Sequence, residues 1–218
     1  MGYGFKVEVW GEYALFSRPE LKVERFSYGI ITPSAARGIL ESIFWKPAIV
    51  YRIDEIAVCS PIKFANIRRN ELKSKLSASN ARTAMTSGDT DKLYISAPDD
   101  ITQRASTLLK DVRYVITAHF DLTEKTGERD SPEKFYNIIL RRLRNGQNHS
   151  MPYFGTRECT ANIRLIEEGT PAPPPIDETR DLGLMLYDMA YGDEIVPTFF
   201  RASMVGGVVD LRGVEVLR

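Results

Sequence analysis

Residues 112–144 read VRYVITAHFDLTEKTGERDSPEKFYNIILRRLR and hold a strand pattern followed directly by a helix pattern. Apolar and polar side chains alternate over the first twelve residues, which predicts a β-strand with one buried face. The alternation places Thr117 and His119 together on the wetter face of that strand. Ser131 then precedes Pro132, a capping residue followed by one suited to the first helical position, and apolar residues recur behind them at helical spacing. The segment therefore predicts a strand and then an amphipathic helix.

A second helix is predicted earlier in the chain, over the stretch ITPSAARGILESIFWKP. Thr32 can cap its start, Pro33 suits its first turn, and Pro47 ends it. FKVEVW at residues 5–10 alternates like a strand, and β-branched residues follow the helix. The resulting order is strand, helix, strand, then strand, helix, strand. It predicts an α+β fold of the ferredoxin-like (RRM-like) βαββαβ type, with both helices on one face of an antiparallel sheet.

The chain is expected to divide at the proline-rich connector GTPAPPPIDE, residues 169–178. Residues 1–168 are expected to form the ferredoxin-like domain, with a polar excursion from the sheet at about 70–110. Residues 179–218 contain several short strand patterns, and these predict a small C-terminal antiparallel β-sheet.

The composition is typical of a soluble globular protein. Of the 218 residues, 43% are hydrophobic and 27% are charged. No apolar run approaches the ~18 residues of a membrane span, so no membrane partner is expected. Two cysteines, Cys59 and Cys159, fit neither a disulfide framework nor a zinc site. The first residues lack a signal-peptide pattern, so a cytoplasmic protein is expected. Because metal-binding and nucleotide-binding motifs are also lacking, neither a metal nor a cofactor is expected.

Charge balances over the whole chain but not along it. Residues 1–144 carry 23 Lys and Arg against 18 Asp and Glu, whereas residues 145–218 carry 6 against 11. Basic residues are dense at 63–82 and at 134–144. Such patches are typical of phosphate-binding surfaces, and the alternative is an ordinary solvated surface.

The candidate RNA-binding residues come from these patches and from the two predicted helices. They are Arg37, Lys63, Arg68, Arg69, Lys134, Arg141, Arg142, Arg144 and Gly146. Lys134, Arg141 and Arg144 recur at helical spacing and so form a basic stripe. Gly146 permits either a close approach to a phosphate or a tight turn after the helix.

His119 is the candidate for proton transfer, because an imidazole exchanges protons near neutral pH. RNA cleavage without metal requires a base for the 2′-hydroxyl proton, an acid for the departing 5′-oxygen, and cations for the charge that develops on the phosphorus centre. A few well-placed side chains suffice for this, since the substrate supplies its own nucleophile. The alternative is a surface histidine without a catalytic role.

Four stretches resemble one protein family: GEYALF at 11–16, TPSAARGILESIFWKP at 32–47, DVRYVITAHF at 111–120 and GTRE at 155–158. On these stretches the chain is identified as a member of the CRISPR-associated Cas-five family, subtype I-C (Dvulg), of the RAMP superfamily. The resemblance implies a metal-independent endoribonuclease that cuts CRISPR repeat RNA (pre-crRNA), retains the 5′ handle, and joins other subunits of the type I-C surveillance complex. The alternative is a non-catalytic subunit that binds the 5′ handle of the crRNA, and duplex DNA is a further candidate ligand.

The catalytic group proposed for this family is a tyrosine, a lysine and a histidine. The resemblance matches the histidine to His119. Phe44 stands at the tyrosine position, and Thr117 and Ala118 stand near the lysine position. The candidate replacements for the cation are Lys46, Arg37, Arg141 and Arg142. For the hydroxyl they are Tyr51 and Tyr114, of which Tyr114 is discounted because it points to the apolar face of its strand.

Overall fold

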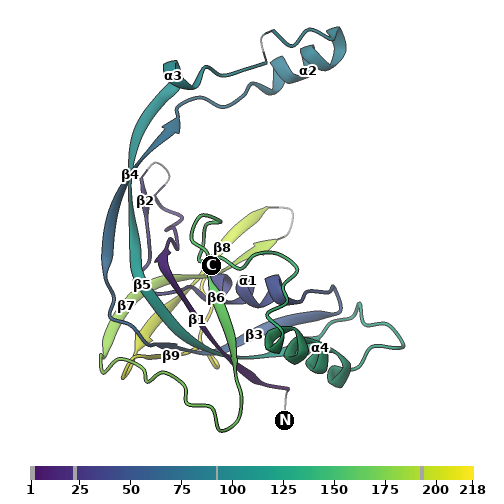
Figure 1. Ribbon diagram of the computed structural model, residues 1–218, viewed down its shortest axis with the longest axis vertical. Coiled ribbons are helices and arrows are strands. Elements are labelled where there is room, and N and C mark those ends of the chain that lie inside the picture. The colour runs from purple at the N-terminus through teal and green to yellow at the C-terminus, as the bar shows by residue number, and fades with distance from the viewer. Residues whose placement is uncertain (1–2, 22–23, 92, 192–193) are drawn as a thin grey trace. The chain divides into compact units, whose positions relative to one another are not determined.

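A computed structural model describes residues 3–21, 24–91, 93–191 and 194–218 (Figure 1). Residues 1–2, 22–23, 92 and 192–193 of the predicted domains lie outside the described residues. The helices and strands are, in chain order, β1 (Phe5–Ala14), β2 (Arg25–Phe26), α1 (Pro33–Ile43), β3 (Ile49–Val58), β4 (Phe64–Leu72), α2 (Ala78–Ser87), α3 (Ala97–Asp100), β5 (Ile101–Leu122), α4 (Pro132–Arg144), β6 (Asn162–Ile166), β7 (Arg180–Tyr191), β8 (Ile195–Met204) and β9 (Val208–Asp210). None of the helices in these described ranges is long and apolar enough to cross a membrane.

The main sheet has the strand order β6-β1-β5-β3-β9, and β2 and β4 also pair with β5. β1 runs antiparallel to β5 and β6, and β3 runs antiparallel to β5 and β9. β7 and β8 form a separate two-stranded antiparallel sheet. The predicted α+β class, with a mainly antiparallel sheet and a second small sheet, is therefore confirmed. Residues 179–218 contribute to both sheets, because β9 joins the main one.

α1 begins at the predicted residues. The hydroxyl oxygen of Thr32 accepts a hydrogen bond from the backbone N–H of Ala35 at 3.3 Å, and Pro33 stands in the first turn. The helix ends at Phe44, whose backbone is extended, three residues before Pro47. Proline removes a helical hydrogen bond and disfavours helix at the residue before it, which accounts for an end ahead of Pro47.

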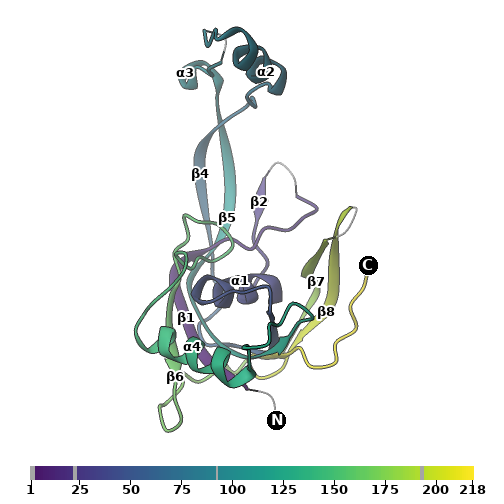
Figure 2. The same cartoon turned by 90° about the vertical axis from the view of Figure 1, so that its right-hand side faces the viewer.

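α4 is capped in the same way, since the Ser131 hydroxyl accepts from the backbone N–H of Lys134 at 3.2 Å. Figure 2 shows α1 and α4 on the same side of the main sheet. The core between these helices and the sheet includes side chains that are at most 1% exposed: Val7, Val9, Ile39, Ile116, Phe135 and Ile139. We call this side of the sheet the helix-covered face and the other side the helix-free face.

The chain forms two compact units, one of Met1–Ala65 with Thr107–Arg218 and the other of Asn66–Ser106. The second unit falls largely within the predicted excursion at about 70–110, and it contains regular structure. Ser77 caps α2, which ends at Gly88 in the left-handed conformation. Asp100 accepts hydrogen bonds from the backbone N–H and the hydroxyl of Ser74, each at 2.8 Å. The polar sequence of this region thus supports helix caps and turns in place of a lasting apolar period.

Candidate functional site

His119 lies near the end of β5, on the helix-free face. Its neighbours Ala118 and Phe120 are buried at 0% and 6% exposure, whereas the His119 side chain is 32% exposed. Successive side chains of a strand point to opposite faces, so His119 points away from the helices, as predicted. Thr117 shares its face and lies between Lys6 of β1 and Glu55 of β3 in the strand register.

The imidazole of His119 is held by a carboxylate that the sequence prediction missed. His119 Nδ1 lies 2.9 Å from Asp54 Oδ2, and His119 Nε2 lies 3.9 Å from Asp121 Oδ1. The first distance is that of a hydrogen bond, and the second is too long for one. Asp54 and Glu55 are adjacent acids that interrupt the alternation of β3, and this interruption is the sequence signal that could have drawn attention to them.

Arg52 is the cation in register with His119. Its Nε donates to Asp121 Oδ2 at 3.0 Å, and its side chain remains 55% exposed. Arg212 follows β9 and pairs with Asp210 at 2.7 Å and with Glu55 at 3.7 Å. The ionic residues on and beside the strands around His119 are therefore mixed in sign. Lys6, Arg52 and Arg212 are basic, and Asp54, Glu55, Asp121 and Asp210 are acidic. The cations predicted from the basic patches are not among them.

Phe44 lies on the helix-covered face and is 5% exposed. Its ring packs against Phe135 of α4 at a centroid distance of 6.0 Å, and its carbonyl oxygen accepts from the Tyr51 hydroxyl at 2.7 Å. Tyr51 is in register with Phe120 on this face. The structure therefore does not bring the Phe44 ring together with His119. Both residues belong to the same end of the sheet, where β3 begins beside the last residue of β5, but they lie on opposite faces.

Neither candidate tyrosine offers a reachable hydroxyl. Burial raises the pKa of Tyr51, whose hydroxyl is engaged by the Phe44 carbonyl. Burial also raises the pKa of Tyr114, which is 2% exposed in the core. Since both phenols are held protonated and enclosed, neither can exchange a proton with a substrate at the surface.

Three of the candidate cations gather around Phe44 and Phe135. Lys46 Nζ lies 5.7 Å and Lys134 Nζ lies 5.8 Å from the centre of the Phe135 ring, and the Arg142 guanidinium lies 5.2 Å from that of Phe44. We call Lys46, Lys134 and Arg142 the α1–α4 cationic cluster. Arg142 Nη1 donates to the Ile43 carbonyl at 2.7 Å, and this bond fixes it at the C-terminal end of α1.

One carboxylate lies beside the α1–α4 cationic cluster. Lys134 Nζ donates to Asp130 Oδ1 at 2.9 Å. This hydrogen bond is the main cause that lowers the pKa of Asp130, and the charge of Lys46 lowers it further. The cluster therefore keeps a net positive charge at neutral pH.

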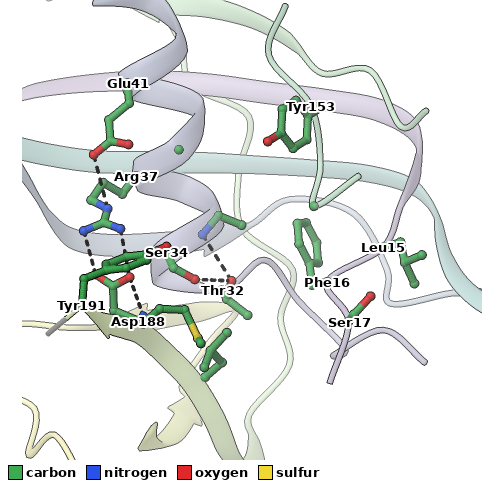
Figure 3. Close-up of a pocket in the computed structure, with 15 residues that line it drawn as sticks. Leu15, Phe16, Ser17, Thr32, Ser34, Arg37, Glu41, Tyr153, Asp188 and Tyr191 are labelled. Carbon is green, nitrogen blue, oxygen red and sulfur yellow. Dashed lines mark hydrogen bonds and ion pairs between the residues drawn. The ribbon is translucent and has the colours of Figure 1, made fainter. Parts of the chain in front are cut away.

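Arg37 connects α1 to the small sheet. Its guanidinium makes two contacts with Asp188 of β7, at 2.7 and 2.9 Å, and its Nε lies 3.5 Å from Glu41 (Figure 3). These residues line a pocket of about 440 Å³ that is also bordered by Tyr153 and Tyr191. Burial raises the pKa of Glu41, an effect that Arg37 opposes and Asp188 reinforces. Because two carboxylates offset one guanidinium, Arg37 is a link between elements and a poor phosphate ligand.

The residues at the C-terminal end of α4 differ in their contacts. Arg144 Nε donates to Glu167 at 2.8 Å. Arg141 is exposed, and within the part of the chain that the structure describes no carboxylate pairs with it. Gly146 has φ +63°, and the N–H groups of Gly146 and Gln147 bond back to the carbonyls of Leu143 and Arg142. This pattern is a Schellman turn, so Gly146 serves the helix end.

The remaining candidate cations come from the other basic patch. Lys63 is exposed, and its carbonyl accepts from the backbone N–H of Lys110 at 2.9 Å. Arg68 and Arg69 lie on β4 within the unit Asn66–Ser106. Arg68 is exposed and Arg69 is half-buried.

Comparisons with known proteins agree on one relationship. The family described as CRISPR-associated protein (Cas_Cas5) matches residues 4–212. A protein of Mannheimia succiniciproducens named CRISPR pre-crRNA endoribonuclease Cas5d is 46% identical over 215 residues, which cover 97% of this chain and 96% of that protein. A Thermus thermophilus protein of the same name is 39% identical over 195 residues, which cover 87% of this chain and 74% of that protein.

Solved structures share the fold. One, described as a CRISPR-associated protein, has a TM-score of 0.67 at 25% identity and covers 96% of this chain and 92% of its own. A functionally uncharacterized protein of Streptococcus mutans has a TM-score of 0.68 at 24% identity and covers 99% and 97%. A chain of a CRISPR RNA-guided surveillance complex has a TM-score of 0.50 at 10% identity, with coverage of 98% and 89%.

Proposed function

The chain belongs to the Cas5d family of CRISPR-associated proteins, and we propose that it is an endoribonuclease that cuts the repeats of CRISPR precursor RNA. The observation that carries this proposal is 46% identity, over nearly the full length of both chains, to a protein named for that activity. The structure adds a partly exposed imidazole on the helix-free face of the sheet, which is the type of group that such a reaction needs.

His119 would act as the general base. Its Nε2 takes the proton from the 2′-hydroxyl, the 2′-oxygen forms a bond to the adjacent phosphorus, and the bond from phosphorus to the 5′-oxygen breaks. The 5′-oxygen takes a proton from solvent, leaving a 2′,3′-cyclic phosphate and a 5′-hydroxyl end. Arg52, beside His119 in the register, supplies a guanidinium for the negative charge that develops on the phosphoryl oxygens. No metal ion is required for these steps.

The RNA would be gripped by the α1–α4 cationic cluster together with Arg141. These side chains combine positive charge with two buried aromatic rings at the end of the sheet where β3 begins and β5 finishes. A strand of RNA that passes around this end would contact the cluster on the helix-covered face and His119 on the helix-free face. The carboxylates near His119 repel phosphate, so the grip must lie elsewhere, and the cluster meets that requirement.

The sheet order supports the ferredoxin-like interpretation. In β6-β1-β5-β3, the two strand–helix–strand halves interleave, and α1 and α4 cover one face. We assign residues 1–168, with the segment near 70–110 as an insertion, to this domain, and residues 179–218 to an accessory region beyond the connector 169–178. The backbone N–H of Ile176 donates to the carbonyl of Val58, and this bond holds the connector against β3.

After cleavage, the protein would retain the 5′ handle of the crRNA and join other subunits of the type I-C complex in the cytoplasm. The fold that it shares with a chain of an RNA-guided surveillance complex supports this placement. A non-cleaving, handle-binding subunit is the second candidate function. One observation favours it: the position of the family's tyrosine holds Phe44, a buried ring without a hydroxyl.

Cleavage of the cognate repeat RNA in EDTA separates the two candidates. The nuclease should cut the RNA in the presence of chelator, and the same RNA with a single 2′-deoxynucleotide at the scissile position should bind but remain intact. A protein that binds the repeat and never cuts it would be the handle-binding subunit. If the deoxy substrate is cut, the 2′-hydroxyl mechanism is wrong.

A further inference from the structure

β3 contains one extra residue at the point where it passes His119. Ile53 pairs with Ala118 and Glu55 pairs with Thr117, so the register shifts and Asp54 has no partner in β5. A bulge of this kind re-aims a side chain, and bulges are frequent beside active sites. Without the extra residue, Asp54 would take the place opposite Thr117 that Glu55 holds.

The backbone of Asp54, the extra residue of the bulge, is also held by the segment around β9. The backbone N–H of Leu211, just after β9, donates to the carbonyl of Asp54 at 2.8 Å. The next residue, Glu55, pairs in register with Asp210 of β9. The Asp54 side chain is 21% exposed and reaches His119 Nδ1 at 2.9 Å. The segment around β9 therefore fixes the backbone of Asp54, and the Asp54 side chain points at the imidazole.

This contact determines which nitrogen of the neutral imidazole carries the proton. A carboxylate accepts hydrogen bonds and cannot donate one, so Nδ1 must be the protonated nitrogen and Nε2 must hold the free lone pair. Asp121 does not compete for Nε2, because its distance is 3.9 Å and its carboxylate is engaged by Arg52 at 3.0 Å. The nitrogen that remains available is the one able to accept a proton from a substrate hydroxyl.

We infer that Asp54 is a positioning residue for His119, a role that the β3 bulge creates. The inference rests on the proposed function, in which His119 is the base. Asp54 fixes the ring orientation and the tautomer, and it stabilises the imidazolium that forms when Nε2 accepts the proton. It does not itself touch the RNA.

Substitution of Asp54 by Asn tests this role with little change in shape. The amide can donate to Nδ1, which favours the tautomer protonated at Nε2, where it cannot act as a base. Single-turnover cleavage of the repeat RNA should slow by between about 10-fold and 10⁴-fold, the upper bound being the whole contribution of a general base. The RNA dissociation constant should not rise, because the variant removes one of the carboxylates that repel phosphate. Asp181→Asn, which removes an exposed carboxylate of β7, is the matched control and should cut at the wild-type rate.

A spectroscopic measurement gives a readout that does not depend on activity. The chain has two histidines, so a long-range ¹H–¹⁵N spectrum contains two imidazoles, and His149→Gln assigns them. At a pH where His119 is neutral, the wild type should show it protonated at Nδ1, and Asp54→Asn should change it to Nε2. Asp121→Asn should leave the tautomer as in the wild type.

The outcomes distinguish the inference from the function on which it rests. A wild-type His119 protonated at Nε2, or an Asp54→Asn variant that cuts at the wild-type rate, overturns the role of Asp54. The Nδ1 tautomer in a wild-type protein that never cuts the repeat overturns the proposed function, while the contact between the two side chains stands. A large loss of RNA affinity in Asp54→Asn would also overturn the inference, because it would make Asp54 part of the binding surface.

Discussion

Gly155, within the GTRE stretch, should tolerate no side chain. Its φ is +79°, in the left-handed region, and a Cβ added there would overlap the carbonyl oxygen and carbon of Leu15. Leu15 is 1% exposed, and its backbone N–H donates to the carbonyl of Phe154 at 3.1 Å. Because the obstacle is fixed backbone and not the end of a flexible side chain, the strain cannot be relieved by a rotamer change.

The cost of Gly155→Ala has two parts. The left-handed conformation costs an alanine about 1–2 kcal/mol, and forcing a group into occupied space adds about 2–3 kcal/mol, for a total of about 3–5 kcal/mol. In a chain of this size, each kcal/mol lowers Tm by about 2–4 °C. Gly155→Ala should therefore lower Tm by about 6–20 °C. Urea unfolding monitored by circular dichroism measures the same loss as a free energy of unfolding.

Gly146→Ala is the matched control. Gly146 has φ +63°, but among the described residues, apart from Gly146 and its two chain neighbours, no atom lies within 4 Å of the position that a Cβ would take. Only the conformational cost of about 1–2 kcal/mol applies, so Tm should fall by about 2–8 °C. Equal losses in the two variants would refute the argument that close approach to Leu15 is what requires glycine at position 155.

Three further predictions concern charge and the aromatic pair. Arg141→Gln should reduce the slope of log affinity for repeat RNA against log salt concentration by about 0.7. Arg144 is paired with Glu167, so Arg144→Gln should change that slope less. Equal slopes for the two variants would contradict this prediction. Burial raises the pKa of Glu41, so the folded state takes up a proton more readily than the unfolded state, and stability should rise as pH falls from 7 towards about 4.5. Urea unfolding at both pH values should show a smaller gain in the free energy of unfolding for Glu41→Gln than for the wild type. The same gain in both proteins would contradict this prediction. Phe44→Tyr should leave the cleavage rate unchanged because the ring is enclosed by Phe135 and Arg142, and a faster rate would move the active site to the helix-covered face.

Local signals predicted the elements that surround the site. Thr32 with Pro33, and Ser131 with Pro132, marked both helix starts, and these caps act within one turn. Alternation gave the direction of His119 on β5, since side-chain direction in a strand depends on parity alone. Both kinds of signal are contained in a few consecutive residues, and tertiary contacts did not change them.

Tertiary contacts determined the rest. The charge of Arg37 suggested a phosphate ligand, but Asp188 lies 151 positions further along the chain, and that pairing becomes visible only in the folded protein. The same holds for Arg144 with Glu167. The position of Asp54 depends on a bulge in β3. The only local signal for it is the interruption of the strand alternation by Asp54 and Glu55.

Single-turnover cleavage of repeat RNA by His119→Ala, with EDTA present, tests the central claim most directly. The imidazole is assigned the proton transfer, so the variant should bind RNA with unchanged affinity and cut it about 10²- to 10⁴-fold more slowly than the wild type. His149→Ala, which removes the other histidine from an exposed loop, should cut at the wild-type rate. Cleavage by His119→Ala at the wild-type rate would contradict the account.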